Sequence, residues 1–317
     1  MTDWSSTAFV FPGQGSQLAG MSKDIAAAYP VARETFEQAD EILGFALSTL
    51  CFEGSQETLD DTINTQPALY VAGIATLRAL QSQLADAQAA FVAGHSLGEF
   101  TALAAAGAVS FADGLRLVRE RGRLMKAAGT RSPGAMAALL GLDADLVREL
   151  TARASAETGG TLVLANDNCP GQIVISGDNT TLDLGLEYAT AAGAKRAVKL
   201  AVSIAAHSPL MEPVAAEFRE TLAATTFQAP RIPVYGNVNA APLTNVDAIR
   251  AELGAQLTQS VRWTESVQAM IAAGAERFVE LGPKDVLSGL LRRIDRSKSG
   301  VSLNSAESLS AFISANG

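Results

Sequence analysis

The pentapeptide Gly94-His95-Ser96-Leu97-Gly98 places a serine hydroxyl between two glycines. The apolar run 89–93 precedes it and predicts a buried strand, and the helix-forming run 99–106 follows it. A Gly-x-Ser-x-Gly sequence at a strand-to-helix turn is typical of a nucleophile elbow, in which the serine occupies a strained turn. The following helix directs its free N–H groups toward any negative charge that develops beside the hydroxyl. The sequence therefore predicts that Ser96 is a nucleophile.

The chain contains two histidines, His95 and His207. Because His95 directly precedes Ser96, its side chain should point away from the hydroxyl on such a turn. His207 is then the only imidazole left to act as a general base near neutral pH. No aspartate follows at the spacing usual in hydrolases. We therefore expect a Ser–His dyad whose imidazole is held by backbone carbonyls.

Arg121 breaks the pattern of the helix predicted over residues 112–128. At about 100° per residue, the other basic residues of this segment fall on one polar arc, whereas Arg121 lies in the apolar arc between Leu117 and Met125. A guanidinium stays charged and is costly to bury without a partner. Two interpretations remain open: a buried salt bridge to an acidic side chain, or a fork that binds a substrate carboxylate through two hydrogen bonds.

Composition limits the class of protein. The chain has 317 residues, of which 48% are hydrophobic and 18% charged, as expected for a soluble protein with one large domain or a large and a small one. A net charge of −9 disfavours general binding to nucleic acid or anionic membranes. Cys51 and Cys169 provide neither a disulfide framework nor metal-ligand spacing. The N-terminus lacks signal-peptide features and the apolar run 102–109 is too short to span a bilayer, so we expect a cytoplasmic protein.

The remaining pattern predicts an α/β fold whose parallel strands end in functional loops. Strands are expected at 8–11, 89–93, 232–237, 277–283 and 301–303, and helices at 25–43, 68–84, 112–128, 247–257, 261–273, 286–294 and the C-terminus. Pro67 is suited to the first turn of the second helix. The glycine-rich loop 12–17 is either a plain turn or a loop whose N–H groups face the site. It lacks the Gly-Lys-Ser/Thr of a phosphate-binding P-loop.

Residues 131–203 are predicted to form a separate small unit within a large domain made of residues 1–130 and 204–317. Strands are expected at 135–140, 161–165, 172–176 and 195–200, and helices at 143–154 and 180–192. This is the split βαβ, ferredoxin-like order. A turn is expected at 166–171, where Asn168 either reaches an active site or bonds locally.

Several stretches, in this order, resemble the malonyl-CoA:acyl carrier protein transacylases, the acyltransferase family of fatty-acid and polyketide synthesis. The matching stretches are 9–17, 65–69, 94–99, 121–125, 168–172, 207–211 and 280–283, so the resemblance covers essentially the whole chain. It implies an α/β-hydrolase-like parallel-sheet core with an inserted ferredoxin-like subdomain. The chain departs from the family pattern at Lys284-Asp285, at Tyr235-Gly236-Asn237 and at Ile204-Ala205-Ala206, which leaves acyl selectivity open.

The resemblance implies a role for each matching residue. Ser96 would be the acyl-accepting nucleophile and His207 its base, while the backbone N–H groups of Gln14 and Leu97 would form the oxyanion hole. Arg121 would bind the malonyl carboxylate. The backbone carbonyl of Gln256 would help orient the histidine. Gln66 and Asn168, which could approach the site from their places in the sequence, are further candidate substrate contacts.

The implied activity is transfer of a malonyl group from malonyl-CoA to the phosphopantetheine thiol of an acyl carrier protein, by a monomer that needs no metal or redox cofactor. Carrier proteins are usually acidic, so docking needs a basic patch. The candidates are Arg116, Arg119, Arg123 and Lys126, or Arg292, Arg293 and Arg296, although each set is equally well explained as a solvated helix face.

Three alternatives remain. A serine esterase or thioesterase would share Ser96 and His207 but pass the acyl group to water, and Arg121 argues against it. An acyltransferase of a polyketide assembly line, or the malonyl-transfer subunit of a malonate decarboxylase, would differ in carrier preference. A non-enzymatic carrier-binding scaffold is disfavoured because nucleophile, base and arginine occur together.

Overall fold

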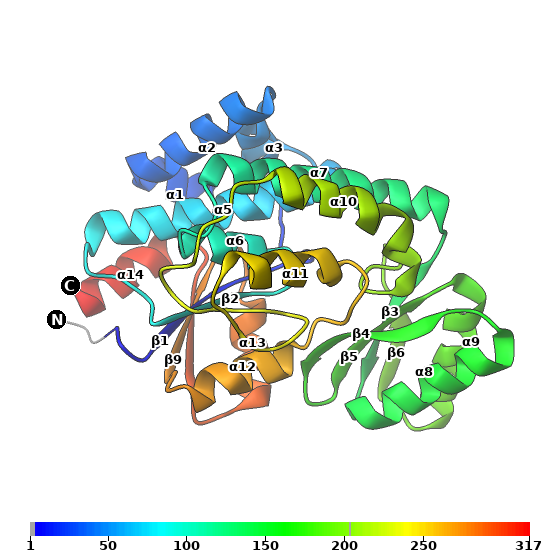
Figure 1. The fold of residues 1–317 in the computed structure, drawn as a ribbon. Helices are drawn as coiled ribbons and strands as arrows, with labels where there is room; N and C mark the ends of the chain where they lie inside the picture. Colours follow the sequence, from blue (N-terminus) through cyan, green and yellow to red (C-terminus); the bar gives the residue numbers. More distant parts are fainter. Residues whose placement is uncertain (1–3, 203) are drawn as a thin grey trace.

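The computed structural model describes residues 4–202 and 204–317, and its largest element is a six-stranded sheet in the order β10-β9-β1-β2-β7-β8 (Figure 1). Its strands are β1 (Thr7–Phe11), β2 (Phe91–Gly94), β7 (Val234–Tyr235), β8 (Pro242–Leu243), β9 (Arg277–Leu281) and β10 (Ser299–Leu303). All neighbours are parallel except β7 and β8. The predicted parallel sheet is confirmed. Residues 1–3 and Ser203, where the predicted small unit ends, lie outside the described residues.

Helices cover both faces of this sheet. They are α1 (Lys23–Ala28), α2 (Pro30–Leu43), α3 (Leu47–Glu53), α4 (Gln56–Asp60), α5 (Thr62–Gln83), α6 (Gly98–Ala105), α7 (Phe111–Arg131), α10 (Glu212–Ala224), α11 (Val246–Gln256), α12 (Trp263–Ala272), α13 (Val286–Ile294) and α14 (Ala306–Asn316). Phe9 and Phe11 of β1 belong to the apolar cluster under α5, α6 and α7, whereas Ala8 and Val10 belong to the cluster under α12 and α13. The strand is therefore buried on both faces, as in other parallel sheets.

Two predicted helix boundaries are wrong. The helix expected at 25–43 is broken at Tyr29, which is extended because the residue before Pro30 disfavours the helical region. The helix expected from residue 68 begins at Thr62, where Asp61 caps it, so that Pro67 lies inside α5 and not in its first turn. The carbonyl of Ile63, which a proline at position 67 cannot engage, accepts a hydrogen bond from Arg119 instead.

The second sheet is antiparallel, in the order β4-β5-β3-β6. Its strands are β3 (Ala135–Leu140), β4 (Leu162–Cys169), β5 (Gln172–Gly177) and β6 (Arg196–Lys199). Helices α8 (Ala144–Thr158) and α9 (Asn179–Ala191) pack on it and share its apolar core (Figure 1). The order of elements is the ferredoxin-like one that the sequence predicts.

The turn expected at 166–171 is wrong in its extent. Strand β4 continues to Cys169 through two register shifts, and only Pro170 and Gly171 remain as the turn. The strand is extended because Ala165 and Asp167 hydrogen-bond through their backbones to Val261, next to α12. These bonds join the second sheet to the segment before α12 and place Asn166 and Asn168 at that junction.

Within the described part of the chain, no helix combines the length and apolar character needed to cross a membrane. Nor do the residues described there include three or more His, Cys, Asp or Glu side chains grouped to hold a metal ion. Cys51 and Cys169 are buried free thiols.

Candidate active site

Ser96 occupies the turn between β2 and α6 with φ 51°, in the left-handed region that non-glycine residues rarely adopt. Glycines make this turn possible. A Cβ on Gly94 would lie 1.9 Å from the Gly98 carbonyl carbon, and one on Gly98 would lie 2.0 Å from the carbonyl oxygen of Phe11. No side chain fits at either position, so the two glycines let strand and helix meet closely enough to raise the serine above the sheet.

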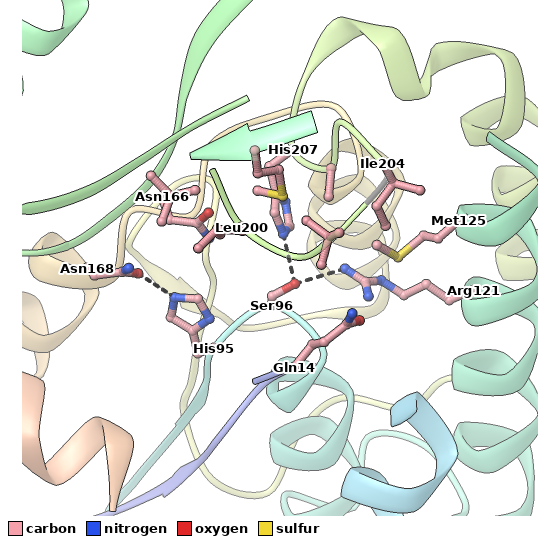
Figure 2. A pocket seen from close by; sticks show the side chains of 14 residues that line it. Gln14, His95, Ser96, Arg121, Met125, Asn166, Asn168, Leu200, Ile204 and His207 are labelled. Atoms are coloured by element: carbon pink, nitrogen blue, oxygen red, sulfur yellow. Dashed lines mark hydrogen bonds between the residues drawn. The ribbon is translucent and has the colours of Figure 1, made fainter. Parts of the chain in front are cut away.

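His207 lies on the opposite side of the serine hydroxyl from the sheet (Figure 2). Its Nε2 is 2.8 Å from Ser96 Oγ, and its Nδ1 is 2.8 Å from the backbone carbonyl oxygen of Gln256. Since a carbonyl can only accept, Nδ1 carries the proton and Nε2 is free to accept the serine proton. The imidazole is therefore oriented by a backbone carbonyl, the arrangement expected for Gln256.

The imidazole of His207 is neutral in this setting. Burial, followed by the nearby Arg121 charge, lowers the pKa of His207 from 6.5 to about 3. A neutral Nε2 is the form that acts as a general base.

This low pKa predicts how stability depends on pH. Below about pH 6.5 the unfolded chain binds a proton at residue 207 that the native protein does not. The free energy of unfolding therefore decreases as the pH is lowered. Between pH 7 and pH 5 the wild type should lose about 2 kcal/mol of unfolding free energy relative to His207→Gln, which lacks the titrating group. Urea denaturation of both proteins at the two pH values measures this. A difference that stays constant with pH would contradict the prediction.

Arg121 is 1% exposed and bonds to three neutral groups. Nη1 donates to Gln66 Oε1 (2.9 Å), and Nη2 donates to Ser96 Oγ (3.0 Å) and to Gln256 Oε1 (2.8 Å). Its Nε is buried without a hydrogen-bond partner, and burial lowers the pKa of Arg121 to about 10. Among the residues described, no carboxylate forms an ion pair with it, which leaves out the internal salt bridge considered above.

These groups open into a cavity of about 180 Å³ (Figure 2). Its polar lining is Gln14, His95, Ser96, Arg121, Asn166, Asn168 and His207; its apolar lining is Met125, Met136, Val174, Leu200, Val202, Ile204 and Ala206. A buried cation and a nucleophile thus stand in a small, mostly apolar space, which suits a short acyl group that ends in an anion.

Two predicted contact residues have different positions. Asn168 lines the cavity, and its Oδ1 is 2.7 Å from Nε2 of His95, which points away from Ser96 as expected (Figure 2). Gln66 is fully buried and is not part of the cavity lining. It lies behind Arg121, and its Nε2 is 2.9 Å from Met125 Sδ. Gln66 is therefore placed to hold the guanidinium rather than to touch a ligand.

The two N–H groups predicted for the oxyanion hole are available. Among the described residues, neither the backbone N–H of Gln14 nor that of Leu97 has an acceptor. The loop that carries Gln14 is held by Thr62 Oγ1, which donates to Gln14 Oε1 (2.5 Å), and by Lys284 Nζ, which donates to the Gly15 carbonyl (2.8 Å). Lys284 is one of the departures from the family pattern, and it makes this contact from a left-handed conformation with φ 64°.

Sequence reasoning missed Asn237. Its Oδ1 accepts from the Ser96 N–H (2.6 Å) and its Nδ2 donates to the Gly94 carbonyl (2.8 Å), so it clamps both sides of the turn. Its place at the end of a predicted strand was a usable signal, because the carboxyl ends of parallel strands lie at one edge of the sheet.

The two candidate basic patches differ in how much of their charge is neutralised. Arg116, Arg123 and Lys126 pair with Asp113, Glu120 and Asp61 respectively, and Arg119 donates to the Ile63 carbonyl. At the end of α13, Arg293 donates to Gln172 Oε1 and to the Pro170 carbonyl. Among the described residues, Arg292, Arg293 and Arg296 form no ion pair.

Comparison with known proteins gives consistent matches over the whole chain. Residues 8–310 match the family model described as an acyl transferase domain. The chain is 43% identical over 309 residues to the malonyl CoA-acyl carrier protein transacylase of Bacillus subtilis, covering 98% of this chain and 96% of that one. It is 45% identical over 306 residues to the protein of the same name from Escherichia coli, covering 96% and 98%.

Solved structures agree. An acyl carrier protein S-malonyltransferase from Vibrio cholerae superposes with a TM-score of 0.93 at 43% identity, over 97% of this chain and 100% of that one. A malonyl-transacylase solved in complex with a type II polyketide synthase acyl-carrier protein gives 0.94 at 39% identity, over 98% and 100%.

Proposed function

The chain belongs to the acyl transferase family, and we propose that it transfers a malonyl group from malonyl-CoA to the phosphopantetheine thiol of an acyl carrier protein. The observation that carries this proposal is Arg121. A buried guanidinium with no carboxylate partner among the described residues hydrogen-bonds the hydroxyl of Ser96. An acyl group with a terminal carboxylate supplies the missing charge, and the malonyl group is a short example of that class.

In the first half-reaction, Ser96 Oγ attacks the thioester carbonyl carbon while its proton moves to Nε2 of His207. The carbonyl of Gln256 accepts from Nδ1 and stabilises the imidazolium that forms. The oxyanion accepts from the N–H groups of Gln14 and Leu97, and each such donor contributes about 3–4 kcal/mol in related sites. The C–S bond then breaks, the thiolate of CoA takes the proton from His207, and a malonyl-serine ester remains.

The second half-reaction runs these steps in reverse. The phosphopantetheine thiol of the carrier protein gives its proton to His207 and its sulfur attacks the ester carbonyl. Breakdown of the tetrahedral intermediate returns the proton to Ser96 Oγ and releases malonyl-carrier protein. Neither half-reaction needs a metal or redox cofactor.

The same residues give a physical basis for acyl selectivity. A malonyl carboxylate satisfies the guanidinium of Arg121, whereas an acetyl group has no charge to offer and leaves that cation unpaired in a mostly apolar cavity. The two buried free thiols fit a reducing compartment, and we place the protein in the cytoplasm.

The test is the intact mass of the protein after mixing with malonyl-CoA. We expect a gain that corresponds to one malonyl group, which disappears when a holo acyl carrier protein is added and reappears on the carrier. Acetyl-CoA under the same conditions should give far less adduct. Release of free CoA without an adduct, or discharge into water as fast as into the carrier, would instead indicate a thioesterase.

A further inference from the structure

Two fully buried carboxyl groups, Glu99 and Glu252, lie next to the catalytic turn, and the proposed reaction gives neither of them a role. Glu99 is in the first turn of α6 and Glu252 is on α11. The N–H groups of two adjacent residues link them: Asn237 donates to Glu99 Oε1 (3.3 Å), and Val238 donates to Glu252 Oε1 (2.5 Å).

The two carboxyl groups have different hydrogen-bond donors around them. Glu252 accepts from the Val238 N–H (2.5 Å) and from Asn239 Nδ2 (3.3 Å), donors that favour a carboxylate. Burial, followed by the charge of Glu252, raises the pKa of Glu99 well above its usual range. Burial also raises the pKa of Glu252, so the two neighbouring carboxyl groups disfavour carrying two charges.

Glu99 in turn fixes the side chain of Gln256. The Gln256 Nε2 donates to Glu99 Oε2 and to the carbonyl of Ser96 (3.0 Å), which leaves Oε1 to accept from Arg121 Nη2 (2.8 Å). A flipped amide would turn its NH₂ group against the guanidinium and its oxygen against the oxygens of Glu99 and Ser96. The acceptor oxygen of Glu99 therefore helps select the orientation in which Gln256 can hold Arg121.

Gln256 also holds the base through its main chain, since its carbonyl accepts from Nδ1 of His207. One residue therefore contacts the nucleophile's backbone, the arginine and the histidine. Glu99 additionally accepts from the Asn237 N–H (3.3 Å), and Asn237 clamps the Ser96 turn. Among the described residues, Glu99 is the carboxyl group that hydrogen-bonds to the side chain of Gln256.

We propose that Glu99 is a positioning residue for acyl transfer: it orients Gln256 and thereby sets the geometry of Arg121 and His207. The proposal rests on the function proposed above, but it makes separate claims about the reactivity of Ser96 and about acyl selectivity.

The experiment compares Glu99→Ala, Glu99→Gln and wild type. Alanine removes the anchor of Gln256, whereas the amide oxygen of glutamine can still accept from Gln256 Nε2. We expect Glu99→Ala to lower kcat/KM for malonyl transfer by about tenfold to a hundredfold, and to reduce the preference for malonyl-CoA over acetyl-CoA. Glu99→Gln should restore both to within about threefold of wild type.

Glu280→Gln is the matched control. Glu280 is also fully buried, but it accepts from the N–H groups of Leu287 and Ser288 at the start of α13, away from the site. The Glu280→Gln substitution should lower thermal stability without changing the malonyl-to-acetyl ratio. If Glu99→Ala does not fold, Glu99→Asp serves in its place. Aspartate keeps a carboxyl group, but its side chain is one methylene shorter, which withdraws the carboxyl oxygens from Gln256 Nε2.

The rate at which phenylmethylsulfonyl fluoride modifies Ser96 separates this proposal from the proposed function, because that reagent needs the dyad but no acyl donor. A slower rate in Glu99→Ala supports positioning of His207 even if malonyl-CoA proves to be the wrong donor. The positioning role would be overturned by a specific result. The wild type would transfer malonyl, and folded Glu99→Ala would keep the wild-type rates of malonyl transfer and of Ser96 modification and the wild-type malonyl-to-acetyl ratio, whatever the effect of the substitution on stability.

Discussion

Replacing Ser96 by alanine is expected to abolish the malonyl adduct and to lower carrier malonylation by about 10⁶-fold, the loss seen when a serine enzyme of comparable design loses its nucleophile. The physical reason is that no other described hydroxyl or thiol shares the Ser96 position between an imidazole at 2.8 Å and a guanidinium at 3.0 Å. The measurement is intact mass for the adduct and a radiolabelled carrier assay for turnover.

Ser310→Ala is a suitable control because Ser310 is exposed on α14, far from the chemistry in sequence and fold. It should form the adduct at the wild-type rate. Persistence of a stoichiometric, carrier-dischargeable malonyl adduct in Ser96→Ala would mean that another residue is the acyl acceptor, and the assignment of the dyad would be lost.

Arg121→Ala carries the second-largest expected effect. A buried charge pair that loses one partner typically costs about 3–5 kcal/mol, so kcat/KM for malonyl-CoA should fall by about 200-fold to 5,000-fold. Acetyl-CoA should be used better than by wild type, because the cavity then no longer holds an unpaired cation beside a neutral acyl group. Competition between the two donors in one reaction measures the change in ratio directly.

Arg123→Ala is the matched control on the same helix, since Arg123 is exposed and pairs with Glu120 at the surface. Such an exposed pair contributes little, and donor preference should not change. An unaltered malonyl-to-acetyl ratio in Arg121→Ala would remove the carboxylate-binding role from this residue, and with it the main argument for a malonyl donor.

Features encoded in a few adjacent residues were predictable. The glycines on either side of Ser96 reflect a local backbone requirement. A Cβ at Gly94 or Gly98 would clash, so the predicted tight turn at Ser96 needs glycine at both positions. His207 followed from counting imidazoles, and Arg121 from one position on a helical wheel. Each prediction rested on a residue type that is unusual at its position in the local sequence pattern.

Features that depend on distant pairing were not predictable in the same way. Asn237 meets Ser96 across 141 positions, and Glu99 meets Gln256 across 157. Polar residues at strand ends or in a first helical turn are ordinary, and only the packed fold shows that these are joined. The length of β4 was misjudged for a similar reason, since its continuation depends on backbone bonds to Val261 that no local propensity reveals.

The cavity has one further consequence for how such enzymes diversify. Ser96, His207 and Arg121 belong to segments of the parallel-sheet layer, whereas Met136, Val174 and Asn168 come from the antiparallel sheet. The side chains that carry out the reaction and much of the wall that surrounds the acyl group thus belong to elements of two different sheets. Mutations in the second layer can reshape the space for the substrate without altering the serine, the imidazole or their hydrogen bonds. New acyl preferences are therefore accessible by small steps, each of which leaves a working catalyst.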